Sequence, residues 1–163
     1  MIKPLALTSA LFIGLITQAS AAGLNTERNI SLALATDVAS RTLAVCRADG
    51  YNVAVTVVDR AGIIKTVLRA DNAGPHTVKA SEQKAFTALS TKTPSGTVME
   101  NSQKTPAANN LKDIPGFLLL GGGVPVKAGD EVVGAIGVAG APGGHLDAQC
   151  ATKALEQISA QLK

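Results

Sequence analysis

The two histidines are the side chains in this sequence best suited to chemistry. His145 ends the stretch "GAPGGH", where a glycine-rich turn runs into an expected helix, and His76 follows the Gly74-Pro75 turn in the same way. A helix start leaves backbone N–H groups unpaired and carries the positive end of the helix dipole, so it favours an anion. An imidazole there can ligate a metal or transfer a proton near neutral pH. A purely structural role is the alternative for each histidine.

Neighbouring groups extend this candidate site. The backbone N–H groups of Gly143 and Gly144 lie beside His145, and we expect them to face an anionic group of a small ligand. Thr77 follows His76 and is a possible helix N-cap that would hold the imidazole in place. We therefore expect His76 to contribute to the site of the "GAPGGH" turn or to a neighbouring one.

The familiar catalytic motifs are absent from the sequence. It contains no phosphate-binding GxxxxGK[ST], no GxSxG, no HExxH and no CxxC, and neither histidine has a neighbour at metal-ligand spacing. The "GGG" at 121–123 precedes an expected strand rather than a helix. We expect it to be a tight hairpin connection, with the backbone wall of a ligand site as the alternative.

The first residues fit an export signal. Lys3 supplies a positive start, Pro4–Ile16 is an apolar run, and Ala19–Ala21 has the small-x-small pattern cut by signal peptidase. We expect residues 1–21 to be removed and residues 22–163 to work in the periplasm or outside the cell. The run is shorter than the roughly 20 residues that span a bilayer, so no stable membrane insertion is expected after cleavage. An uncleaved anchor is the alternative.

Export gives the two cysteines, Cys46 and Cys150, a simple interpretation. Thiols in an oxidising compartment tend to pair, and these two lie in expected helices at opposite ends of the chain. A disulfide is the expected arrangement. A metal or redox pair and two separate thiols are the alternatives, although no ligand spacing supports a metal.

Composition narrows the class of protein. The chain has 163 residues with 46% hydrophobic content, enough for one compact core, and only 2% aromatic residues. Its net charge is only +3, and the basic residues are scattered rather than clustered. Nucleic-acid binding requires a basic stripe that tracks phosphates, so we expect no nucleic-acid partner.

Hydrophobic periodicity and turn residues predict a single α+β domain. The strands come in adjacent blocks, which favours a mostly antiparallel five-stranded sheet packed by the N- and C-terminal helices in a profilin-like α-β-α arrangement. If those helices lie side by side on one sheet face, the two cysteines can meet. The expected elements are a helix over Thr26–Asp49, strands over Tyr51–Val57 and Ile63–Leu68 around an Asp59–Gly62 turn, a helix after Gly74-Pro75, a connection over 91–116 with one or two short helices, strands over Phe117–Leu120, Val124–Lys127 and Val132–Val138, and a helix over Asp147–Leu162.

Two long stretches carry a family resemblance. They are "VAVTVVDRAGIIKTVLRADNAGPHTVKASEQKAFTA" and "GGGVPVKAGDEVVGAIGVAGAPGGHLDAQCA". Together they resemble the GlcG/HbpS family of haem-binding or haem-degrading proteins, whose members share the VVD-x-x-G hairpin, the KA-x-TA helix and the GG-x-P…VVGAIGV ending. The resemblance spans nearly the whole chain after the export signal.

The resemblance implies homo-oligomers and, in some members, a bound haem or related tetrapyrrole. Among this chain's residues, the donors available to haem iron are His76 and His145 first, then Tyr51 and Met99, once the cysteines pair. Haem propionates need cationic or N–H partners. Lys79 and Lys84 beside His76, or Gly143 and Gly144 beside His145, are the candidates, with a solvated helix face as the alternative for both lysines.

Three classes of function stay open at this point. An exported protein that binds or handles haem is favoured by the resemblance. An enzyme acting on a small anionic metabolite would use His76 or His145 as acid or base. A structural or sensory partner protein would need neither histidine.

Overall fold

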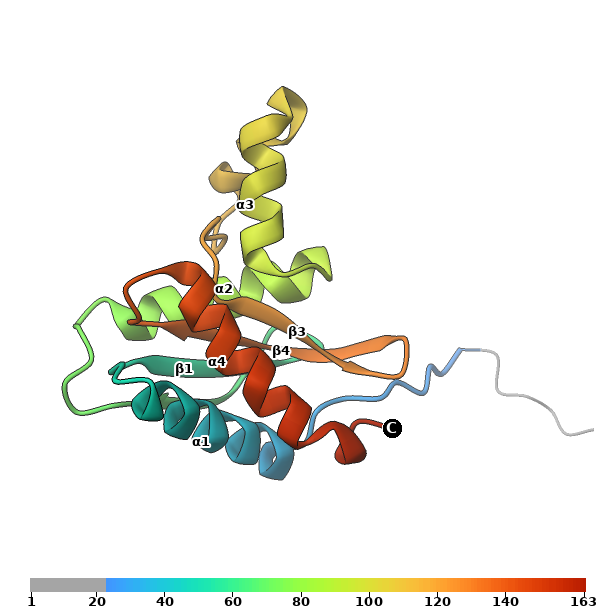
Figure 1. Cartoon of the computed structure of the whole chain (residues 1–163). Helices are drawn as coiled ribbons and strands as arrows, with labels where there is room; N and C mark the ends of the chain where they lie inside the picture. Colours follow the sequence, from blue (N-terminus) through green and yellow to red (C-terminus); the bar gives the residue numbers. More distant parts are fainter. Residues whose placement is uncertain (1–22) are drawn as a thin grey trace, which may run out of the picture.

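The structure is a computed structural model that describes residues 23–163, so the expected export signal, residues 1–21, lies outside the described residues. The described chain forms one α+β domain with three layers (Figure 1). Helices α1 (Leu32–Ala48) and α4 (Gly144–Gln157) cover one face of the sheet, and α2 (Thr77–Thr91) covers the other. The expected arrangement of helices around an antiparallel sheet is confirmed.

The sheet has four antiparallel strands in the order β2-β1-β4-β3. Their bounds are β1 (Ala54–Asp59), β2 (Ile64–Arg69), β3 (Gly123–Ala128) and β4 (Glu131–Ala139). Every residue of β1 is buried, because helices cover both of its faces, whereas β2 is an edge strand with exposed positions. The turn between these strands lies where it was predicted. It is held by the Asp59 carboxylate, which accepts from the N–H groups of Ala61 and Ile63 at 2.9 and 3.0 Å.

The prediction of a fifth strand over Phe117–Leu120 is wrong, because this segment does not join the sheet. Its polar backbone groups bond to side chains of neighbouring helices instead of to a strand. The N–H of Leu118 donates to Thr87 Oγ1 at 2.8 Å, and Ser95 Oγ donates to the carbonyl of Leu120 at 2.7 Å. The Phe117 ring packs edge-on against Phe86, 6.1 Å between centroids. These contacts supply hydrogen-bond partners to the backbone of the segment outside the sheet. The apolar run therefore forms a loop that packs against α2.

Helix α1 begins at Leu32, six residues later than predicted, because Ser31 caps it. Ser31 Oγ accepts from the N–H of Leu34 at 3.2 Å, which ends the extended segment before it. In that segment the N–H of Ile30 donates to the carbonyl of Val133 at 3.0 Å, so this stretch runs beside β4 instead of coiling.

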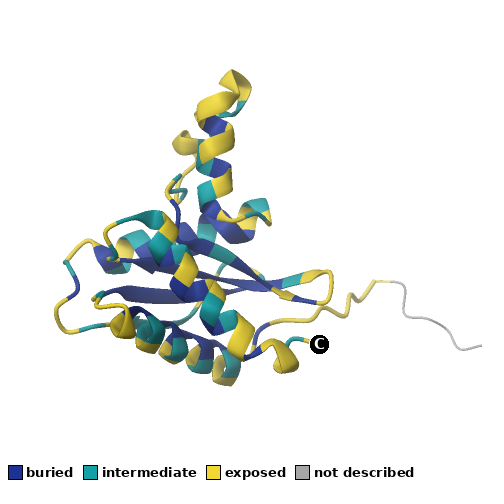
Figure 2. Cartoon of the chain, in the orientation of Figure 1, coloured by how far each residue is buried: buried dark blue, intermediate teal, exposed yellow. Residues whose placement is uncertain are grey.

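The region between α2 and β3 forms an arm. It contains α3 (Ser95–Lys104) and the 3₁₀ helix η1 (Pro106–Asp113), as expected for a connection with short helices. The arm projects away from the three layers (Figure 1). Most of its surface is exposed, and η1 has no buried residue (Figure 2).

The disulfide predicted from the sequence joins the two helices that share a face. Cys46 of α1 and Cys150 of α4 are bonded, with 5.4 Å between their Cα atoms, and both are buried. The same bond shows that the two terminal helices lie side by side, the condition under which the cysteines were expected to meet. Within residues 23–163 no helix is long and apolar enough to cross a membrane.

Candidate functional site

A cleft lies where the base of α3, the "GGG" loop and the first turn of α4 meet. Its volume is about 490 Å³. His145 and Met99, two of the potential donors in the sequence, both line it. The lining residues are Pro94, Gly96, Thr97, Met99, Glu100, Leu120, Gly121, Gly123, Gly144, His145 and Ala148.

Glycines let two backbone segments form a wall of this cleft. A Cβ at Gly144 would lie 2.6 Å from the carbonyl oxygen of Gly121, and a Cβ at Gly121 would lie 3.0 Å from the Gly144 carbonyl carbon. The loop at 121–123 is therefore not the hairpin connection that we expected first, because no strand precedes it. It forms a backbone wall of this cleft, and the alternative expectation, that the wall belongs to a ligand site, stays a prediction.

His145 occupies the first turn of α4 and is exposed. Its imidazole folds back over Gly143, where a Cβ would lie 2.8 Å from Cε1. The Gly143 carbonyl accepts from the N–H groups of Leu146 and Asp147 at 2.9 and 3.2 Å, which forms the turn. The N–H groups of Gly144 and His145 have no hydrogen-bond partner among residues 23–163. Two backbone donors and an imidazole are thus available at one edge of the cleft.

His76 lies outside the residues that line this cleft. It is exposed at the N-cap position of α2 and makes no side-chain cap, and its imidazole also folds over a glycine two residues earlier, Gly74. Thr77 is buried and does not cap the helix, because its hydroxyl donates to the Gly74 carbonyl at 2.7 Å. The two histidines share a local motif but do not share the cleft.

Lys84 is neither solvated nor part of the cleft lining. Its Nζ donates to Asp147 Oδ2 at 2.8 Å and to the carbonyl of Val138 at 3.0 Å, and the two paired side chains are only 2% and 3% exposed. The other carboxylate oxygen of Asp147 accepts from the N–H of Ala141 at 2.9 Å. The pair thus ties α2 to β4 and to the loop that leads into α4, directly behind the cleft.

Burial determines the electrostatics of this pair. Desolvation raises the pKa of Asp147 above its ordinary value of 3.8, while the hydrogen bond and charge of Lys84 lower it in part. A Cβ at Gly122 would lie 3.0 Å from Lys84 Nζ, so the second glycine of the loop leaves space for the ammonium group.

Sequence reasoning missed Asp147 as the partner of Lys84. A signal was present, because Lys84 lies on a helix face whose other buried residues carry no charge. The other buried residues of that helix are Thr77, Ser81, Ala85, Thr87, Ala88 and Leu89. A lysine on such a face needs a buried anion, and Asp147 in the first turn of α4 is the acid that the sheet brings within reach.

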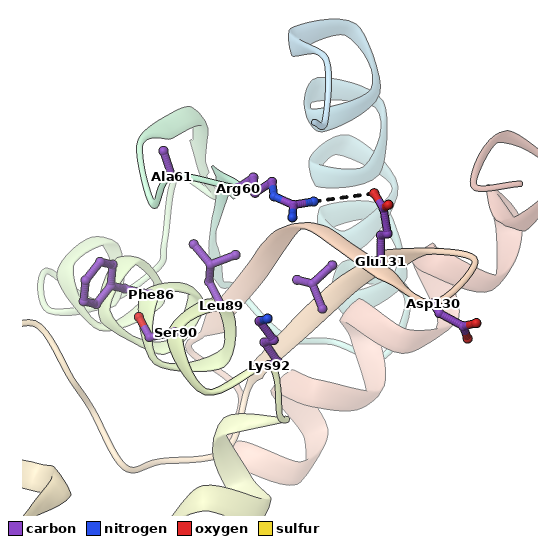
Figure 3. Close-up of a pocket in the computed structure, with 9 residues that line it drawn as sticks. Arg60, Ala61, Phe86, Leu89, Ser90, Lys92, Asp130 and Glu131 are labelled. Atoms are coloured by element: carbon purple, nitrogen blue, oxygen red, sulfur yellow. Dashed lines mark ion pairs between the residues drawn. The ribbon is translucent and has the colours of Figure 1, made fainter. Parts of the chain in front are cut away.

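A second cleft, of about 570 Å³, is lined by the C-terminal part of α2 and by the turns of the two hairpins (Figure 3). Phe86 and Leu89 of α2 line it, and Arg60 reaches from one hairpin toward Glu131 of the other, 3.5 Å apart. Arg60 also lies 3.4 Å from Glu27. No histidine, methionine or tyrosine lines this cleft, so it lacks the donors found beside α4. Among the described residues, no group of three or more His, Cys, Asp or Glu is placed to hold a metal ion.

The protein is a three-layer α+β domain with a four-stranded antiparallel sheet and a backbone-lined cleft at the start of a helix. The profile of the family described as "Haem degrading protein HbpS-like" matches residues 30–156. The chain belongs to this family.

Solved structures agree with the assignment. A double mutant of HbpS from Streptomyces reticuli is 37% identical, with a TM-score of 0.80, over 95% of this chain and 99% of that one. Protein ORFY from Klebsiella pneumoniae is 28% identical, with a TM-score of 0.80, over 85% and 96%. PduOC in complex with heme is 20% identical, with a TM-score of 0.73, over 78% and 94%, and shows likeness of fold. No curated protein sequence matches the chain significantly.

Proposed function

We propose that this protein binds haem or a related tetrapyrrole in the cleft at the start of α4. The observation that carries the proposal is that His145 and Met99, two side chains of the types that ligate haem iron, line one cleft of about 490 Å³. Family membership supports the ligand class. One structural relative, PduOC, is described as a complex with heme, which is consistent with this ligand.

The chemistry of the lining fits such a ligand. Pro94 and Leu120 offer apolar contact to a macrocycle, and the free N–H groups of Gly144 and His145 suit a propionate. Glu100 is the one acidic residue of the lining, and Lys104 lies 3.9 Å from its carboxylate and offsets its charge. Bound haem supplies redox chemistry at iron, while these residues bind it, orient it and limit its contact with water.

Filling the cleft tests the proposal. Ala148 lines it from α4, and Ala148→Phe places a ring in the space that a macrocycle would occupy. Haemin titration followed by the Soret band is expected to show saturable one-to-one binding in the wild type and at least about tenfold weaker binding in this variant. Ala33→Phe on the exposed surface of α1 is the matched control. Equal binding by all three proteins would place haem elsewhere.

An enzyme acting on a small anionic metabolite is the second candidate. The observation that favours it is the exposed imidazole of His145 beside two unpaired N–H groups, because an acid or base next to an anion subsite is a common catalytic arrangement. Turnover that requires His145 but proceeds without haem would support this function over haem binding.

We also propose that the protein works outside the cytoplasm as a homo-oligomer. The buried Cys46–Cys150 disulfide supports an oxidising compartment. The export signal expected at residues 1–21 supports the same location. The projecting arm of α3 and η1, which buries little of its own surface, supports assembly with further copies.

A further inference from the structure

We propose that a third cleft, distinct from the one at His145, is a binding site for a small dianion that carries carboxylate or phosphate groups. The cleft has a volume of about 500 Å³. It lies between the C-terminal half of α1 and the loop that follows β2, which run next to each other at one end of the domain (Figure 1). The residues that carry the argument are Arg47, Arg69, Tyr51, Asn52, Asn72 and Asp71.

Two arginines face this cleft from different elements without a carboxylate partner. Within residues 23–163, neither Arg47 of α1 nor Arg69 of β2 makes an ion pair, whereas Arg41 and Arg60 each do. The presence of an arginine at position 47 is accounted for by the helix dipole, because Arg47 lies in the last turn of α1, where a cation is favourable. Arg69 is at the end of an edge strand, where no helix dipole acts on it.

The Arg69 side chain is held in place. Its Nη2 donates to the carbonyl of Ala73, which ties the strand end to the following loop. A guanidinium has five N–H donors, so one such bond leaves donors for a ligand. Fixing the side chain beforehand reduces the entropy that binding would otherwise cost.

Tyr51, Asn52 and Asn72 add groups to the lining that can donate hydrogen bonds to an anion. The Tyr51 ring packs against the core, and its hydroxyl has no partner among the described residues. The amides of Asn52 and Asn72 add further N–H groups, and Asp71 is the only carboxylate. A cleft with two cations, several neutral donors and one acid is complementary to a ligand rich in acceptors, which is the chemistry of a small dianion.

Calorimetric titration with inorganic phosphate and with succinate tests the site, each against sodium chloride at matched ionic strength. We expect saturable binding of at least one probe, and at least about tenfold weaker binding of it in both Arg47→Gln and Arg69→Gln. Arg41→Gln is the matched control, because Arg41 lies on the same helix, pairs with Asp37 at 2.9 Å and does not line the cleft. The probe that binds more tightly identifies the anionic group.

The proposal is overturned if neither probe saturates, if either cleft variant keeps wild-type affinity, or if Arg41→Gln loses as much. Thermal unfolding of each variant confirms that it folds, and both cleft arginines are exposed. His145→Ala separates this site from the haem proposal, because it is expected to leave binding of the probe unchanged. A loss in His145→Ala equal to that in the cleft variants would show one site rather than two.

Discussion

Lys84 Nζ lies 2.8 Å from Asp147 Oδ2 in the interior of the domain, and the side chains of both residues are almost fully buried. The pair connects the middle of α2 to the first turn of α4. It therefore fixes the position from which Gly144 and His145 face the cleft. Removing one member of a buried pair leaves the other charge without compensation, which commonly costs about 3 to 5 kcal/mol.

Lys84→Met is expected to lower the free energy of unfolding by about 3 to 5 kcal/mol at neutral pH. Without Lys84, burial raises the pKa of Asp147 further above 3.8. Asp147 of the folded variant then keeps its proton to a higher pH than in the unfolded chain, so its contribution to stability is present in acid and is lost as pH rises above about 3.8. Urea unfolding of the variant and the wild type, compared in acid and at neutral pH, measures the effect.

Lys79→Met is the matched control, since Lys79 is on the same helix and its side chain is 68% exposed in a surface pair with Glu82. We expect a change within about 0.5 kcal/mol. A loss in Lys84→Met that does not grow with pH would show that Asp147 is not the group left uncompensated.

Gly144→Ala is expected to destabilise the protein by about 1 to 3 kcal/mol, because the new Cβ meets the Gly121 carbonyl oxygen at 2.6 Å. Gly96→Ala, also in the first turn of a helix, has only a 3.4 Å contact and is expected to be neutral or slightly stabilising. Thermal unfolding compares the two. Equal effects would contradict the close approach that forms the cleft wall.

The disulfide is expected to stabilise the fold by roughly 4 to 5 kcal/mol, because it closes a loop of 104 residues in the unfolded chain. The double variant Cys46→Ala, Cys150→Ala measures this in urea unfolding. Intact mass before and after reduction checks the bond in exported protein. Alkylation of both thiols without reductant would contradict it.

Self-association is expected from the exposed apolar residues around the arm. Ile114 and Leu120 are 41% and 43% exposed there. Light scattering after size exclusion is expected to give a multiple of the subunit mass, and Ile114→Glu to lower it. A single-subunit mass of the wild type at micromolar concentration would rule out a stable oligomer.

Local patterns in the sequence were sufficient for much of the fold. Alternation of Val53, Val55 and Val57 predicted one buried face of a strand, and all three lie in the core beneath α1 and α4. The apolar run Phe117–Leu120 misled the same reasoning. Hydrophobicity indicates burial but not strand pairing, and this run is covered by contacts with α2 and α3.

The site was predictable only in part, because its contacts are between distant segments. The Gly-x-His pattern is the same at Gly74 and Gly143, and both histidines were candidates from the sequence alone. The structure places only His145 in the cleft with Met99. The pairing of Lys84 with Asp147 depends on how α2 and α4 pack on opposite faces of one sheet, which no local pattern specifies.

Haemin titration of the wild type, His145→Ala and His76→Ala, followed by the Soret band, tests the central claim most directly. We expect His145→Ala to weaken binding by about 1 to 3 kcal/mol and to shift the Soret band, because an iron ligand or a propionate contact is lost. We expect His76→Ala to bind like the wild type, because His76 lies outside the cleft. Wild-type binding by His145→Ala, or a loss confined to His76→Ala, would contradict the assignment of haem to this cleft.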